Sequence, residues 1–195
     1  MGRAALGFKA RTGRAILVVL SREGTRAIEV VERTEVALLP PGEFAPYHAA
    51  ESLAPPQARA HVKASIARAR SLAEDAVRAA AQRCLRAGHE VCGCAVLVGS
   101  RMPAWSTDEI LAVHVRMHQA EGELFREVLV DGAHACGLAL TTLPDKTAFD
   151  AAAQRMRIPR AQLDAQLVAL GKSVGPPWGQ HQKEAAAAAL VALQS

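Results

Sequence analysis

The chain has 195 residues, of which half are hydrophobic and only 4% aromatic, and its formal net charge is +4. This length predicts one domain, residues 1–195, and the apolar fraction excludes a disordered chain. The basic balance is compatible with nucleic acid or another anion as a partner, without requiring one. The apolar runs are too short to cross a bilayer, so we expect no membrane partner and a cytoplasmic protein.

The first 40 residues alternate apolar runs with turn residues. The runs at residues 4–9 and 15–21 are rich in Ala, Val, Ile and Leu, and further extended sequence covers residues 25–39. Short turns that contain Gly13 and Gly24 separate the runs. Runs of this length and composition, punctuated by glycine, predict an antiparallel meander of strands.

Helices and strands alternate in the rest of the chain. Two prolines open a predicted helix over residues 57–87, after a predicted loop at 42–56, and an apolar strand follows at 91–98. Ser106 and Glu109 form a capping box for a long helix predicted over 107–136. The remaining predicted elements are a strand at 138–143, helices at 147–156 and 160–170, and a terminal helix ending at 193.

This βββ-α-β-α-β-α order predicts an α/β fold with a mixed five-stranded sheet flanked by helices, because strands joined through helices pair in parallel. The segment Gly7-Phe8-Lys9-Ala10-Arg11-Thr12-Gly13 resembles the first strand and turn of ribonuclease H-like domains of the RuvC-like resolvase type. The helix carrying Ala120-Glu121-Gly122 and the strand Gly137-Leu138-Ala139-Leu140 are similar in placement to elements of that family. The resemblance covers most of the chain and implies a ribonuclease H-like fold.

The resemblance also implies where a nuclease would carry its acids. RuvC-like enzymes clamp two Mg²⁺ ions with carboxylates at the ends of the first and fourth strands and on the last helix. In this chain the first position is Lys9, the fourth strand ends at Val98-Gly99 without an acid, and the last helix offers only Glu184. We therefore expect that the catalytic carboxylates are not retained and that the domain is not a nuclease.

The basic replacements suggest an anion site. If the fold is right, Lys9 and Lys183 lie close together and Arg11 lies on the adjoining turn, so the three cations could bind a phosphate or carboxylate. The leading hypothesis is a non-nuclease ribonuclease H-like domain that binds nucleic acid or a nucleotide there. The competing interpretation is that these lysines are solvated or paired with acids such as Glu184.

The predicted helix 107–136 carries a polar cluster. Helical periodicity places Glu121 within the apolar stripe and His114 and His118 beside it. One interpretation is a buried network facing the sheet, with Glu121 held by Lys9 or Lys183. The other is a divalent metal site made by His114, His118 and Glu121, which would make the protein a small metal-dependent enzyme.

Three features complete the sequence-based expectations. Tyr47 and His48 lie in the predicted loop 42–56, where functional residues often gather. The four cysteines lack the spacing of a zinc site, so we expect free thiols. The alanine-rich helices offer a third hypothesis, a structural or assembly protein that forms a homodimer.

Overall fold

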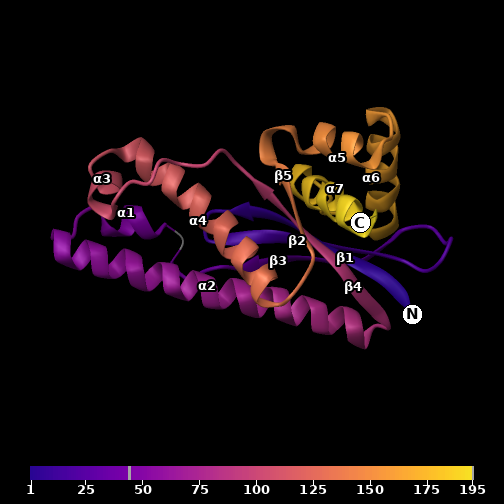
Figure 1. Ribbon diagram of the computed structural model, residues 1–195, viewed down its shortest axis with the longest axis horizontal. Helices are drawn as coiled ribbons and strands as arrows, with labels where there is room; N and C mark the ends of the chain where they lie inside the picture. The colour runs from indigo at the N-terminus through magenta and orange to yellow at the C-terminus, as the bar shows by residue number, and fades with distance from the viewer. Residues whose placement is uncertain (44, 195) are drawn as a thin grey trace.

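The computed structural model describes residues 1–43 and 45–194, so Phe44, in the predicted loop 42–56, and Ser195 lie outside the described residues. A five-stranded sheet forms the centre, with helices packed on both of its faces (Figure 1). Two long helices, α2 and α4, cover one face, and α5, α6 and α7 cover the other. Among the described residues, no helix combines the length and the apolar character that crossing a membrane would require.

The sheet is mixed, and its strand order is β3-β2-β1-β4-β5. The first three strands pair antiparallel, whereas β4 pairs parallel with β1 and β5 pairs parallel with β4. The strands are β1 Gly2–Arg11, β2 Arg14–Arg22, β3 Glu29–Ala37, β4 His89–Val98 and β5 Leu140–Pro144. The predicted α/β class with a mixed five-stranded sheet is thereby confirmed. Its parallel part brings the carboxyl ends of β1, β4 and β5 to one edge.

The helices lie mostly where the sequence pattern predicts them. Eight helical segments are seen in the described part of the chain: α1 Pro46–Ala50, α2 Pro55–Arg86, α3 Thr107–Leu111, α4 His114–Ala135, the 3₁₀ turn η1 Asp145–Thr147, α5 Ala148–Met156, α6 Arg160–Val174 and α7 Gln180–Gln194. The buried face of α2 consists of small side chains, half of them alanine, which lets this 32-residue helix lie close to the sheet and to α4. Small side chains thus substitute for the scarce aromatics in filling the core.

Two departures from the predicted elements concern the polar cluster. The predicted loop 42–56 contains a short helix, α1, and the predicted helix 107–136 is broken at Ala112 and Val113 into α3 and α4. Val113 has extended dihedral angles and is more than a third exposed, although its spacing from Ile110 and Met117 is that of one helical face. The break lets Ile110 and Met117 both be buried against α1 and α2 while His114 begins a new helix.

Helix α7 packs directly on β1 because Gly7 has no side chain. A Cβ added to Gly7 would overlap the Ala185 carbonyl oxygen and lie 2.6 Å from the Ala189 backbone nitrogen. The helix is buried along its length from Glu184 to Leu193, and alanine fills most of these positions. This close approach carries the first turn of α7 to the carboxyl end of β1, which places Glu184 beside Lys9.

Candidate functional site

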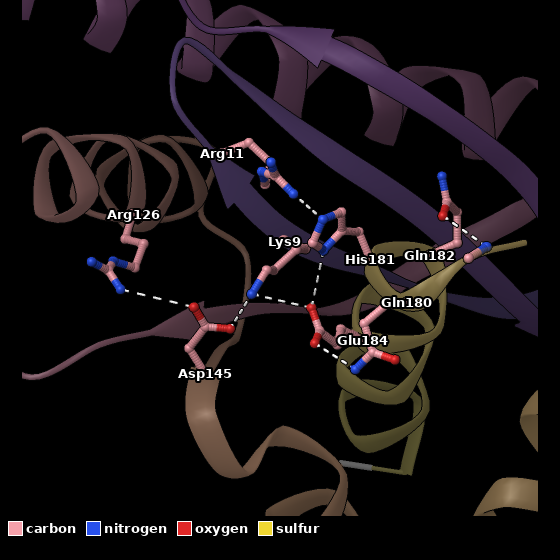
Figure 2. Close-up of polar contacts among 9 residues, drawn as sticks. Lys9, Arg11, Arg126, Asp145, Gln180, His181, Gln182 and Glu184 are labelled. Atoms are coloured by element: carbon pink, nitrogen blue, oxygen red, sulfur yellow. Dashed lines mark hydrogen bonds and ion pairs between the residues drawn. The ribbon is translucent and has the colours of Figure 1, made fainter. Parts of the chain in front are cut away.

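The carboxyl ends of the parallel strands meet the first turn of α7, and charged side chains gather there. Lys9 comes from the end of β1, Asp145 follows β5 directly, and Glu184 lies in α7. Open α/β sheets generally hold their ligands at this edge. Figure 2 shows the side chains of all three pointing toward one another.

Lys9 bridges two carboxylates at the centre of this group. Its ammonium nitrogen forms an ion pair with Asp145 Oδ1 and lies 3.1 Å from Glu184 Oε2. The side chains of Lys9 and Glu184 are each 11% exposed, and that of Asp145 is 25% exposed. The positive charge is therefore shared between two acids in a position that is mostly shielded from solvent, where an unpaired charge would strongly destabilise the fold.

Further polar contacts hold the two carboxylates. Glu184 Oε1 accepts a hydrogen bond from Gln180 Nε2 at 2.9 Å, and its Oε2 lies 3.4 Å from His181 Nδ1. The other ring nitrogen of His181 contacts the Arg11 guanidinium (Figure 2). Arg11 is exposed, so the group continues from the buried ion pairs to the surface through His181. The arrangement orients Glu184 from three sides.

Arg126 approaches Asp145 from α4. Its guanidinium lies 3.9 Å from Asp145 Oδ2 and occupies the space that a Cβ would need at Gly99 and at Gly122. The two glycines therefore allow the arginine to pass between the end of β4 and helix α4. A long side chain enclosed in this way has a defined direction, and here it points at the carboxylate.

A hollow of about 680 Å³ opens beside this group at the ends of β4 and β5. Its charged lining consists of Arg101, Arg126, Lys146 and Asp145, so cations outnumber acids. Arg101 and Lys146 are exposed, and Trp105 presents a half-buried ring to the same hollow. The space is large enough for a phosphate group together with part of a sugar or base.

The predicted anion-site residues are only partly brought together. Lys9 and Arg11 both lie at the carboxyl end of β1, but Lys183 lines a separate hollow with side chains of α5 and α6. The competing interpretation, that Lys9 pairs with an acid such as Glu184, describes the observed contact. The sequence interpretation missed Asp145. Its position directly after a parallel strand, Leu140–Pro144, is the signal that could have identified it.

Glu121 is buried as predicted, but its predicted partner is wrong. Glu121 Oε1 accepts hydrogen bonds from the backbone nitrogens of Tyr47 and His48, each at 3.2 Å, and contacts His48 Nδ1 at 2.9 Å. Lys9 is instead engaged by Asp145 and Glu184. Helix α1 has no capping side chain of its own at Ala45, so this carboxylate satisfies the free N–H groups of its first turn.

The buried carboxylate affects its neighbour. Burial in the first place, and the negative charge of Glu121 in the second, raise the pKa of the Tyr47 hydroxyl above its usual value. Tyr47 is therefore neutral at physiological pH and is harder to deprotonate than an ordinary tyrosine.

The two predicted histidines are on the surface and not against the sheet, so that part of the prediction is wrong. His114 and His118 are exposed, one helical turn apart at the start of α4. They are joined by His48 of α1, whose ring centroid lies 5.0 Å from that of His114 and 4.5 Å from that of His118. Three imidazoles thus meet near Glu121. The sequence pattern grouped only His114 and His118 with Glu121, because His48 comes from a segment predicted as loop.

Two solved structures resemble this one over nearly the whole chain. The structure of Thermus thermophilus RuvC aligns with a TM-score of 0.51 and 13% identity, covering 96% of this chain and 92% of that one. The structure of T. thermophilus RuvC in complex with Holliday junction substrate aligns with a TM-score of 0.53 and 14% identity, covering 97% and 92% respectively. No protein-family model matches the chain, and no curated protein matches it in sequence. The likeness confirms the predicted fold class: the chain has the ribonuclease H-like fold seen in RuvC.

Proposed function

We propose that this protein binds nucleic acid at the carboxyl edge of its sheet and does not cleave it. The observation that carries the proposal is the Lys9 ammonium group held between Asp145 and Glu184. The similar fold of RuvC, described in complex with a Holliday junction, supports nucleic acid as the class of partner. A branched DNA is accordingly the first substrate to test.

The absence of cleavage follows from charge. A two-metal mechanism needs several carboxylates whose negative charge attracts and holds Mg²⁺. At this edge the two nearby carboxylates share the positive charge of Lys9, which is covalently part of β1, and Asp145 also has Arg126 at 3.9 Å. A divalent cation placed there would be repelled by the ammonium group at a few ångströms. Lys9 therefore supports a stable, metal-free centre in place of a nuclease site.

Binding would be carried by the cations around this centre. Arg101 and Lys146 are exposed on the rim of the hollow, and Arg126 lies within it. Phosphate groups attract such cations, and arginine can hold two phosphate oxygens at once. Arg116 covers one face of the Trp105 ring, with its Cζ 4.5 Å from the ring centroid, and a base or sugar could pack on the other face. The proposed contacts are mostly to the backbone, so we expect recognition of shape more than of sequence.

The test is a binding titration with a fluorescent four-way DNA junction, followed by fluorescence anisotropy at several salt concentrations. The double variant Arg101→Ala/Lys146→Ala removes two exposed cations with little effect on the core. We expect weaker binding and a salt dependence whose log–log slope is smaller by about 2, or roughly one per lost phosphate contact. The matched control is Arg86→Ala, in the last turn of α2 near the opposite end of β4.

Equal binding by the double variant and the wild type would refute the proposed interface. Cleavage is followed in the same samples with 10 mM Mg²⁺ and with Mn²⁺. We expect intact DNA; metal-dependent cleavage that is lost on Glu184→Gln, in a protein that still folds, would contradict the assignment of Lys9 as a replacement for metal.

A further inference from the structure

The three-histidine cluster contains an imidazole nitrogen whose bonding is unexplained. Nε2 of His48 is buried and has no hydrogen-bond partner among residues 1–43 and 45–194. Nδ1 of the same ring is bonded to Glu121 Oε1 at 2.9 Å. Buried polar atoms usually have partners, so an unpartnered nitrogen in a polar cluster indicates a ligand that completes it.

The tautomer of His48 follows from its contact with Glu121. Glu121 Oε1 accepts the backbone N–H groups of Tyr47 and His48, so this oxygen acts as a hydrogen-bond acceptor. Nδ1 of His48 must then carry the proton that it donates, and in the neutral ring Nε2 has a free lone pair. A carboxylate that orients an imidazole in this way is the arrangement found behind many metal-ligating histidines.

The other two rings supply matching nitrogens. Nε2 of His114 and Nε2 of His118 lie 3.2 Å apart, and each of the three histidines offers one nitrogen within 4.8 Å of the others. Zinc–nitrogen bonds of about 2.0–2.1 Å in tetrahedral geometry separate two ligand atoms by about 3.3–3.4 Å. The observed separation of the His114 and His118 nitrogens is close to this value, and the nitrogen that His48 offers lies within 4.8 Å of both.

A hydrogen bond between His114 and His118 does not account for the unpartnered nitrogen of His48. One of the two nitrogens can donate to the other, but that bond leaves Nε2 of His48 unpaired beside them. A metal cation satisfies all three lone pairs at once.

We infer that His48, His114 and His118 bind one transition-metal ion of the Zn²⁺ class, with Glu121 as the positioning residue behind His48. Imidazole ligands favour Zn²⁺, Co²⁺, Ni²⁺ or Cu²⁺ over Mg²⁺. His114 and His118 are exposed, so the ion is accessible to solvent and a fourth coordination position remains for water. Three histidines with one open position are the ligand set of catalytic rather than structural zinc. This site is separate from the proposed nucleic-acid interface and is tested independently of it.

The test uses the full-length protein without a histidine tag, stripped of metal and titrated with Zn²⁺ against a chromophoric chelator. We expect one equivalent to bind per chain. Co²⁺ should give the intense visible absorption bands of a four-coordinate ion. His118→Ala should weaken Zn²⁺ binding by at least tenfold, and because His118 is exposed this variant should still fold. Glu121→Gln should weaken binding by about 10–100-fold through the orientation of His48.

The matched control is His134→Ala, which removes an exposed histidine from the other end of α4. It should bind Zn²⁺ as the wild type does. Full-strength binding of one equivalent by His118→Ala, an equal loss in His134→Ala, or no Zn²⁺ binding by the wild type would each overturn the inference.

Discussion

Replacing Lys9 by methionine tests whether the ammonium group holds the carboxyl edge of the sheet together. Methionine keeps the apolar stem of the side chain and removes only the charge. Asp145 and Glu184 would then face each other across a largely dry position without the cation that separates them. Removing one partner of a buried ion pair costs about 3–5 kcal/mol.

Other contacts of the two carboxylates reduce the loss of stability in this variant. Asp145 retains Arg126 at 3.9 Å and is a quarter exposed, and Glu184 retains its bond from Gln180. We therefore expect a loss of about 2–4 kcal/mol in the free energy of unfolding. For a chain of this length, that loss corresponds to a decrease in Tm of about 5–15 °C.

Urea unfolding followed by circular dichroism measures the loss, with Lys183→Met as the control. Lys183 lies next to Glu184 in α7 but lines a different hollow, so its replacement should change stability by less than about 1 kcal/mol. Equal stability of the two variants would refute the view that Lys9 is the charge that this edge requires.

Lys9→Asp extends the same reasoning to metal. This variant should be less stable than Lys9→Met, because three carboxylates would meet at one point. Mg²⁺ should restore part of the loss, by about 2.7 kcal/mol at a hundredfold excess over its Kd. Wild-type protein should show no comparable stabilisation by Mg²⁺. An absence of Mg²⁺ stabilisation in folded Lys9→Asp would mean that the carboxylates cannot adopt a metal-binding geometry.

Other predictions concern packing, thiol reactivity and pH. Gly7→Ala should lower the free energy of unfolding by about 3 kcal/mol or more, because the new methyl group would overlap the backbone of α7. In the control Gly179→Ala, the new methyl group would make only an ordinary van der Waals contact, so the free energy measured by urea unfolding should change little. Burial raises the pKa of the Cys94 thiol to about 12. A disulfide reagent at pH 8 should therefore modify Cys94 only after the protein unfolds, as measured by mass spectrometry. Rapid modification of the native protein would contradict the buried position. Burial in the first place, and the neighbouring carboxylates in the second, raise the pKa of Glu127. The ionised side chain is therefore less stable in the folded protein than in the unfolded chain. Glu127→Gln should therefore stabilise the protein at pH 7. The gain should fade as the pH falls from the raised pKa to the usual carboxyl pKa, and it should be absent below the usual pKa, where both states are protonated. A gain that persists at pH 3 would refute the electrostatic cause.

The sheet could be predicted from sequence because its signals are local. Apolar runs bounded by glycine turns specify the strands, and helices between strands specify parallel pairing. The helix break at Val113 and the helix at 46–50 could not be predicted in this way. Both depend on tertiary contacts: α1 is capped by Glu121, a residue more than 70 positions away in the chain.

The candidate site was predictable only in part, for the same reason. The resemblance in residues 7–13 correctly located Lys9 at the end of the first strand, and periodicity correctly buried Glu121. Periodicity cannot say which cation meets which acid, and the predicted partnership between Glu121 and a lysine failed because Asp145 and Glu184 hold Lys9. Pairing of charges is decided by the spatial arrangement of distant elements.

The close packing of α7 on β1 has a consequence for how the protein is made. During synthesis, β1 and the other strands emerge from the ribosome before residues 180–194, which cover one face of the sheet. Until those residues follow, the apolar face that contains Leu20, Ala95 and Leu97 lacks its main cover, and Lys9 lacks Glu184. The nascent chain therefore carries an incomplete core and an incomplete charge cluster at the same time, a state that chaperones recognise by its exposed apolar surface. Assembly of the charged edge and closure of this face of the core therefore both require residues 180–194.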